Sequence, residues 1–211
     1  MTPIPRGLAL DVDDTLSNTV TPYFDLLREN FGNPENLTTQ EIVAKYGHGS
    51  RVPYWKTEEI RIWKRTIFDD PKFYDTLELH ENSNHIVEKI NSIIPISCYI
   101  TARPTFVIEA TKAWLKKHGF PEREVIARPP EYEDGNKWKA EELVKLYPNI
   151  VGIVDDDPRL ISALPKEYQG AVFLYSHLEY DQETPLNVIP CKDWEAVYDK
   201  IQKQAHLFGR A

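Results

Sequence analysis

The stretch Leu8–Val12 constrains the fold of this chain more than any other. It is an apolar run that follows Gly7 and passes directly into the aspartates Asp11, Asp13 and Asp14. Short apolar runs bounded by a turn residue are typical of buried β-strands. In open α/β sheets, polar groups at the carboxyl end of a strand face the crevice in which ligands bind. The stretch therefore predicts an α/β fold with a polar site after its first strand.

The spacing of Asp11 and Asp13 indicates what this site could hold. Side chains two residues apart share one face of an extended strand, so we expect the two carboxylates to lie close together. Carboxylates this close repel each other, and a hard divalent cation such as Mg²⁺ relieves the repulsion. An acidic turn that only faces water is the alternative, because Asp and Asn are common turn residues.

The size and charge of the chain limit its class. Its 211 residues suffice for one large domain, or for a domain with a sizeable insertion. Apolar residues make up 41% and charged residues 27%, which is ordinary for a globular protein. The net charge of -8 argues against general binding to nucleic acid or to an anionic membrane. It does not exclude a small anionic substrate, because one metal ion and one lysine can reverse the local field.

Cysteine usage and apolar content favour a cytoplasmic protein. Cys98 and Cys191 have neither the number nor the spacing of a disulfide framework or a zinc site, and Cys98 is predicted to be a core residue. No stretch approaches the about 20 apolar residues of a membrane span. Residues 1–6 lack the apolar core of a signal peptide. The sequence does not indicate an oligomeric state.

Residues 19–81 differ in character from the rest of the chain. Apolar residues recur at helical spacing in the stretches 22–31, 38–46 and 57–68, of which the second opens with a capping-box pattern. Asp70–Pro71 ends the third. No stretch here has the alternation of a strand. We therefore expect a core domain of residues 1–18 and 82–211 with a helical insertion of residues 19–81.

Aromatic residues are dense in this insertion, and packing in its core explains most of them. Tyr54 and Trp55 differ because they follow Pro53 in a polar loop. We predict that this pair faces a ligand.

From residue 81 onward, strands and helices alternate. Apolar stretches at 96–100, 125–127, 150–154 and 171–175 have the length of buried strands, and stretches with helical spacing separate them. Alternation on short connections is typical of parallel sheets. We therefore predict an α/β fold with a Rossmann-like, mainly parallel sheet and helices on both faces.

Polar or reactive residues end three of these strands. Asp11 and Asp13 follow the first, Thr101 follows a second, and Asp155 and Asp156 follow a third. The carboxyl ends of parallel strands meet at one edge of a sheet, so residues far apart in the sequence can converge there.

Each of these features also has a simpler explanation. Thr101 can cap the helix that follows it, and Asp155–Asp157 can form a capped turn. Lys137 and Lys139 begin the helix before the last acidic strand, where lysines are commonly solvated. The occurrence of all of them in this order at strand ends favours a site over separate structural roles.

This order of residues resembles that of the haloacid dehalogenase-like (HAD) hydrolases. The matching features are Asp-x-Asp-x-Thr after a strand, a threonine that ends the next core strand, a later lysine, and an acidic pair after a further strand. The resemblance covers residues 6–17 and 85–205, and the insertion corresponds to the family's helical cap of the first type. It implies phosphoryl transfer through an aspartyl-phosphate, with Mg²⁺ as cofactor.

Carried over to this sequence, the resemblance makes Asp11 the nucleophile. Asp13 would protonate the leaving group and then activate water, while its backbone carbonyl would contact the metal. Thr101 and the backbone amides after it, at Ala102 and Arg103, would hold the phosphoryl oxygens.

The resemblance also implies a lysine that neutralises the nucleophile and the phosphoryl group. Lys139 is preferred because the residues that follow it resemble the family's pattern, and Lys137 is the alternative and a candidate substrate contact. Asp155 and Asp156 would complete the magnesium site with the first two aspartates. Arg103 is either a substrate contact or a partner for the acidic cluster.

Two segments, residues 71–74 and 153–158, are similar to the 5′(3′)-deoxyribonucleotidase branch, whereas Asp14 and Ala102–Arg103 depart from its motifs. We expect a magnesium-dependent phosphomonoester hydrolase that acts on a small phosphorylated metabolite such as a nucleotide. Sugar phosphates, phosphoproteins and polynucleotides are alternative substrates. A non-catalytic binding or regulatory module of the same fold is the alternative function.

Overall fold

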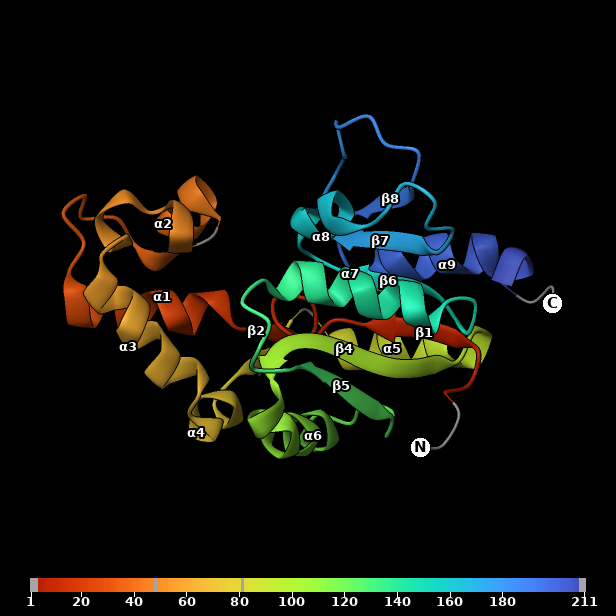
Figure 1. Ribbon diagram of the computed structural model, residues 1–211, viewed down its shortest axis with the longest axis horizontal. Helices are drawn as coiled ribbons and strands as arrows, with labels where there is room; N and C mark the ends of the chain where they lie inside the picture. Colours follow the sequence, from red (N-terminus) through yellow and green to blue (C-terminus); the bar gives the residue numbers. More distant parts are fainter. Residues whose placement is uncertain (1–3, 48, 81, 209–211) are drawn as a thin grey trace.

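The core of the protein is a six-stranded sheet in the order β5-β4-β1-β6-β7-β8 (Figure 1). The computed structural model describes residues 4–47, 49–80 and 82–208. Every neighbouring pair of strands in this sheet is parallel, as predicted. The strands are β1 (Gly7–Leu10), β4 (Ile96–Pro104), β5 (Glu124–Arg128), β6 (Ile150–Asp155), β7 (Ala171–Tyr175) and β8 (Asn187–Cys191).

β1 lies in the middle of the sheet, between β4 and β6, and all of its residues are buried. Successive side chains of β1 point to opposite faces of the sheet, and each face has its own hydrophobic core. Leu8 and Leu10 lie in one of these cores and Ala9 lies in the other. Asp11 directly after the strand still bonds to the sheet, because its N–H donates to the Val154 carbonyl oxygen at 2.9 Å. The aspartates that follow the opening apolar run thus lie at the carboxyl edge of the sheet.

Helices cover both faces of the sheet, as predicted. The core of one face contains residues of α5, α6 and α9, and the core of the other contains residues of α7 and α8. Trp114 of α6 is fully buried, and its indole N–H donates to the Leu77 carbonyl oxygen at 2.8 Å. These helices are α5 (Ser83–Ile93), α6 (Ile108–Lys117), which follows a 3₁₀ turn at Thr105–Val107, α7 (Gly135–Leu146), α8 (Pro158–Ala163) and α9 (Trp194–Phe208).

The insertion after β1 is helical, as predicted, and lies beside the carboxyl edge of the sheet (Figure 1). Aromatic rings form its core, with Phe24 and Trp55 packed edge to face at 5.3 Å between centroids. The predicted capping box between Thr38 and Glu41 is present. Its helices are α1 (Val20–Phe31), α2 (Thr39–Tyr46), α3 (Glu58–Phe68) and α4 (Pro71–Asp75), with 3₁₀ turns at Gly49–Arg51 and Pro53–Trp55.

The insertion differs from the sequence prediction in two places. β2 (Ser17–Asn18) and β3 (Glu78–Leu79) pair antiparallel where the chain enters and leaves the insertion, so one short strand lies in a segment expected to have none. Strands of two residues are too short for an alternating pattern to show. The predicted helix breaker Asp70–Pro71 also starts α4, because the Asp70 side chain accepts a hydrogen bond from the Lys72 N–H and proline fits the first turn of a helix.

β8 is the other element that the sequence does not predict. It contains Pro190, and a proline argues against a strand because it cannot donate to the ladder. β8 lies at the edge of the sheet, where a missing donor is tolerated.

Cys98 and Cys191 are buried free thiols, so the prediction that Cys98 is a core residue is confirmed. Among the helices of residues 4–47, 49–80 and 82–208, none combines the length and the apolar character needed to cross a membrane.

Gly7 leaves no room for a side chain in β1. A Cβ atom there would lie 2.0 Å from the Pro95 carbonyl oxygen and 2.4 Å from Ser97 Oγ. We expect Gly7→Ala to lower the free energy of unfolding by about 1–3 kcal/mol, measured by urea denaturation. Ser92→Ala, at an exposed position of α5, is the control and should change it by less than about 0.5 kcal/mol. Equal stability of both variants would contradict this close packing.

Candidate active site

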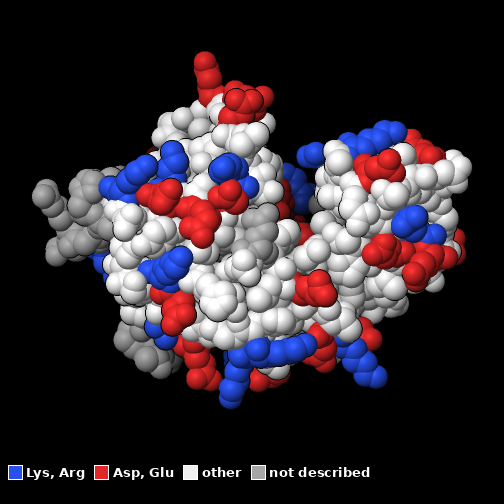
Figure 2. Space-filling view, turned by 180° about the vertical axis from the view of Figure 1, so that it is seen from behind, with Lys and Arg blue, Asp and Glu red and all other residues white. Residues whose placement is uncertain are grey.

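A cavity of about 1030 Å³ opens between the carboxyl edge of the sheet and the helical insertion. Figure 2 shows it as a cleft between two lobes, with acidic and basic side chains inside it. Asp11, Asp13 and Asp14 line it directly after β1, together with Lys139 of α7 and Asp156 after β6. The sheet therefore brings together polar residues from distant parts of the sequence.

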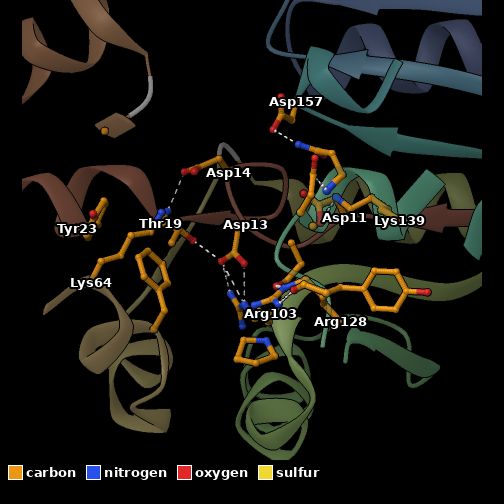
Figure 3. A pocket seen from close by; sticks show the side chains of 18 of the residues that line it. Asp11, Asp13, Asp14, Thr19, Tyr23, Lys64, Arg103, Arg128, Lys139 and Asp157 are labelled. Atoms are coloured by element: carbon orange, nitrogen blue, oxygen red, sulfur yellow. Dashed lines mark hydrogen bonds and ion pairs between the residues drawn. The ribbon is translucent and has the colours of Figure 1, made fainter. Parts of the chain in front are cut away.

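Lys139 joins the carboxylates of Asp11 and Asp155, and Figure 3 shows it beside Asp11. Its Nζ lies 2.9 Å from Asp11 Oδ1 and 2.6 Å from Asp155 Oδ2, and all three side chains are buried. One oxygen from each of Asp11, Asp155 and Asp156 lies within 4.8 Å of the other two. Three carboxylates and one ammonium group thus leave an excess of negative charge in a place with little water.

Burial makes ionisation of these carboxylates costly. It raises the pKa of Asp11 to about 8, although the Lys139 ammonium opposes the shift. It also raises the pKa of Asp155, and it raises the pKa of Asp156 well above its ordinary value, to which neighbouring carboxylates contribute. For Lys139, burial alone would lower the pKa, but the charges of Asp11 and Asp155 outweigh burial and raise it. A cation beside the carboxylates would relieve their repulsion.

The carboxylate oxygens that lack a partner fit such a cation. Asp155 uses both of its oxygens, because one accepts from the lysine and the other from the Asp157 N–H at 2.9 Å. Asp156 Oδ1 accepts from Thr15 Oγ1 at 2.9 Å. In the part of the chain that the structure describes, Asp11 Oδ2 and Asp156 Oδ2 accept no hydrogen bond. Carboxylate oxygens are preferred ligands of Mg²⁺, so this buried group of aspartates could hold a metal ion.

Asp13 points toward Arg103 (Figure 3). It accepts from Arg103 Nε at 3.0 Å and Arg103 Nη2 at 2.8 Å, and from Thr19 Oγ1 at 2.7 Å. Arg103 is only 2% exposed, and its guanidinium lies 4.2 Å from the centroid of the Tyr74 ring. Of the two alternatives for Arg103, the structure favours a partner for the acidic cluster.

Of the four aspartates predicted for the metal site, the structure gathers the carboxylates of three, Asp11, Asp155 and Asp156. The guanidinium of Arg103 takes both oxygens of the Asp13 carboxylate. This arrangement is compatible with the resemblance, which assigns the metal contact of Asp13 to its backbone carbonyl. Contact between a metal and the backbone carbonyl of Asp13 stays a prediction.

Arg103 also controls the charge of Asp13. Burial opposes ionisation of the carboxyl group, but the guanidinium and the Thr19 hydroxyl outweigh it and lower the pKa of Asp13. Asp13 is therefore an ionised carboxylate in this arrangement. Because Thr19 directly precedes α1, the same contacts connect β4 of the core to the start of the insertion.

Thr101 and Ala102 lie near the end of β4, where the sequence predicts them. Thr101 is fully buried, its Oγ1 accepts from the Arg103 N–H at 3.2 Å, and among the described residues it does not line the cavity. Ala102 and Arg103 do line it. The contact of Thr101 with a phosphoryl group stays a prediction.

The two candidate lysines of α7 have different surroundings. Lys139 is buried among the aspartates, whereas Lys137 is exposed and is not one of the described residues that line the cavity. Two residues along an α-helix turn the side chain by roughly 200°, so both lysines could not face the same site. The structure therefore gives Lys137 no contact with the cavity.

Tyr54 and Trp55 are also not among the described residues that line the cavity. The Tyr54 hydroxyl donates to Asn33 Oδ1 at 3.1 Å, and the Trp55 indole N–H donates to the Gly32 carbonyl oxygen at 3.1 Å. Trp55 is 4% exposed, because it packs in the core of the insertion. The pair therefore stabilises the insertion, in contrast to the ligand contact predicted from its loop.

Sequence reasoning missed the basic side chains that the insertion contributes. Arg61, Lys64 and Arg65 of α3 line the cavity, as do Arg128 and Arg159 of the core. The three residues of α3 lie between its apolar positions, which indicates an exposed helix face. Only the packing of the insertion shows that this face borders the cavity.

Asp14 lies in the turn that leads from β1 to the insertion, as its place after the first strand suggests. It has a positive φ of 58°, and its Oδ1 accepts from the backbone N–H groups of Thr19 and Val20 at 3.0 and 2.8 Å. Burial raises the pKa of Asp14 to about 7. Asp14 thus holds the first turn of α1 against the loop after β1.

Comparisons with known proteins match the chain through its fold. No protein-family model and no curated protein matches the sequence. Among solved structures, a HAD-superfamily hydrolase, subfamily IA, variant 1, from Geobacter sulfurreducens PCA has a TM-score of 0.53 and 12% identity, over 93% of this chain and 99% of that chain. A HAD-superfamily hydrolase from Ehrlichia chaffeensis has a TM-score of 0.53 and 14% identity, over 96% of this chain and 98% of that chain.

A third solved structure extends the likeness to a protein with a bound anion. It is a HAD family hydrolase from Deinococcus radiodurans R1 with bound phosphate and sodium, and it has a TM-score of 0.50 and 11% identity, over 99% of this chain and 100% of that chain. Identities this low demonstrate a shared fold and leave the chemistry to the site. The protein therefore has the fold of the HAD-superfamily hydrolases, with a helical insertion after the first strand of its sheet.

Proposed function

We propose that the protein is a magnesium-dependent phosphomonoester hydrolase that forms an aspartyl-phosphate on Asp11. The observation that carries the proposal is the Lys139 ammonium between Asp11 and Asp155, at the edge of a cavity and beside a third carboxylate. This arrangement combines a nucleophile, a fixed positive charge and a cation site next to open space. The HAD fold, and the phosphate bound to the structurally similar Deinococcus protein, support the same chemistry.

Asp11 would carry the phosphoryl group between two displacements. In the first, a carboxylate oxygen of Asp11 bonds to phosphorus while the bond from phosphorus to the leaving-group oxygen breaks. In the second, water attacks the same phosphorus, and inorganic phosphate leaves with Asp11 restored. Lys139 stays charged through both steps and offsets the negative charge on the phosphoryl oxygens.

Asp11 and Asp156 would hold Mg²⁺ through their free oxygens, with Asp155 beside them. When bound, the ion lowers the pKa of Asp11 and neutralises charge on the phosphoryl group. Asp155 has a second task in this arrangement, because its hydrogen bond of 2.6 Å orients Lys139 toward the nucleophile.

Asp13 would move the proton. As an ionised carboxylate it suits the second step, in which it takes a proton from the attacking water. In the first step it must donate a proton to the leaving group, and the negative charge of a bound phosphate ester favours its protonation. Arg103 is then a positioning residue, which orients Asp13 and lowers the pKa of its carboxyl group.

The proposed substrate is a small phosphorylated metabolite, because the substrate has to fit between the insertion and the core. A nucleotide remains our expectation from the sequence, and the exposed ring of Phe106 lines the cavity where a base could stack. A sugar phosphate is the second candidate. A screen of phosphorylated metabolites with Mg²⁺, read as phosphate release, separates the two, and binding without any turnover would favour a non-catalytic module.

Asp11→Asn tests the nucleophile. The amide keeps the shape of the side chain but cannot form a stable phosphoryl intermediate, so phosphate release should fall by at least about a thousandfold. The measurement is kcat for p-nitrophenyl phosphate with Mg²⁺. Asp199→Asn, at an exposed position of α9, is the matched control and should keep its activity. Ordinary turnover by Asp11→Asn would exclude the proposed mechanism.

Removal of divalent cations tests the metal site. EDTA should abolish phosphate release, and added Mg²⁺ should restore it. Mg²⁺ should also raise the Tm of the wild-type protein, because the ion relieves repulsion among buried carboxylates. Asp156→Asn should lose this Tm shift, whereas Asp199→Asn should keep it. A Tm that does not respond to Mg²⁺ would contradict the assignment of the three aspartates.

Arg103→Met tests the control of Asp13. Loss of the guanidinium raises the pKa of Asp13, so the acidic limb of the pH profile of kcat, where the base becomes protonated, should move to higher pH by about 1–3 units. Arg103→Lys keeps the charge and should move it less. Activity that falls equally at every pH would assign Arg103 a structural role only. Circular dichroism checks that both variants fold.

A further inference from the structure

The insertion side of the cavity is positively charged. Lys64 of α3 lines the cavity together with its neighbours Arg61 and Arg65. Arg128, the last residue of β5, and Arg159 of α8 line it from the core. In Figure 3, Lys64 and Tyr23 lie on one side of Asp13, while Asp11 and Lys139 lie on the other. The basic group is therefore separate from the lysine that serves the nucleophile.

Lys64 is partly buried, and the described residues give it no anionic partner. Its Nζ lies 5.8 Å from the centroid of the Tyr23 ring and 5.4 Å from that of Phe68, so it is flanked by aromatic faces. Within residues 4–47, 49–80 and 82–208, no carboxylate lies within ion-pair distance of it. Burial lowers the pKa of Lys64, and the positive charges of Arg159 and Arg128 add to the shift.

The other basic side chains are neutralised to different degrees. Arg61 pairs with Glu58, and Arg159 pairs with Asp157. Arg128 donates to the backbone carbonyl oxygens of Ala102 and Tyr132, which carry no net charge. Among the described residues, Lys64 and Arg65 of the insertion and Arg128 of the core thus line one cavity without a carboxylate partner. Like charges in such a place are unfavourable unless an anion joins them.

We propose that Lys64, with Arg128 across the cavity, binds a second anionic group of the substrate. The natural substrate is then a phosphomonoester that carries a further phosphate or carboxylate group. This inference rests on the proposed function, because it assumes that the reacting phosphoryl group lies at Asp11. A cavity of about 1030 Å³ has room for a small metabolite that reaches both places. The aromatic faces beside Lys64 limit access of water and strengthen its attraction for an anion.

Binding of compounds that cannot be hydrolysed tests the second site without turnover. Alkane bisphosphonates of increasing length are titrated by calorimetry with Mg²⁺, each beside the alkyl monophosphonate of the same length. One length should bind at least about tenfold more tightly than its monophosphonate, since a charge-assisted contact is gained. The corresponding phosphonocarboxylates show whether phosphate or carboxylate is preferred. Equal affinities of the bisphosphonates and monophosphonates at every length would overturn the inference.

Variants test whether Lys64 causes the tighter binding of the bisphosphonate. Lys64→Gln should remove the advantage of the bisphosphonate, and Lys64→Arg, which keeps the charge, should retain most of it. Lys72→Gln, at an exposed lysine of the neighbouring helix α4 that does not line the cavity, is the matched control and should behave as the wild type. An advantage that survives in Lys64→Gln would also overturn the assignment.

Kinetics separate this inference from the function on which it rests. If the protein hydrolyses no phosphomonoester with Mg²⁺, the proposed function fails, while the bisphosphonate titration still decides the second anion site. If it hydrolyses esters with one and with two anionic groups at equal kcat/KM, the function stands and the inference fails. We expect the ratio of kcat/KM, two anions over one, to fall by about tenfold or more in Lys64→Gln and to stay unchanged in Lys72→Gln.

Discussion

The contact of Lys139 with Asp11 and Asp155 is the interaction on which the site depends. It joins β1, β6 and α7 through buried charges, at 2.9 and 2.6 Å. A buried ion pair of this kind is weak evidence for stability, because desolvation offsets much of the attraction. Removal of one partner, however, would leave an uncompensated charge in the core. The group is therefore better explained by chemistry than by folding: the lysine keeps two carboxylates together where a cation and a phosphoryl group can reach them.

A second buried pair connects this centre to the insertion. Asp13 is held by Arg103 from β4 and by Thr19, which directly precedes α1. The neighbouring Asp14 accepts hydrogen bonds from the first backbone N–H groups of that helix. In the loop after β1, Asp11 thus contacts Lys139 of the core, and Asp13 and Asp14 accept hydrogen bonds from the start of the insertion. Any movement of the insertion against the core would act on Asp13, the residue that we propose to move protons.

The insertion covers the cavity and also contributes charged side chains to it. Its aromatic residues pack mainly with one another, and the polar face of α3 brings Lys64 to the cavity. The Asp11 side and the insertion side of the cavity therefore have separate positive charges: Lys139 lies among carboxylates, and Lys64 has no carboxylate partner among the described residues. In our proposal, this separation distinguishes the reacting group from the rest of the substrate. The insertion would then be the part of the protein that selects which ester is bound.

Much of the fold could be predicted from local patterns. Apolar runs of strand length, helical spacing and one capping box indicated the parallel sheet and the helical insertion, because these depend on neighbouring residues. Elements of two residues, and a strand with Pro190 at the sheet edge, left no such pattern. Likewise the sequence by itself determined which residues end the strands, and hence that aspartates and a lysine would meet at one edge of the sheet. Only the tertiary structure decided that Arg103 pairs with the Asp13 carboxylate and that Lys64 faces the cavity, because these contacts depend on how distant elements pack together.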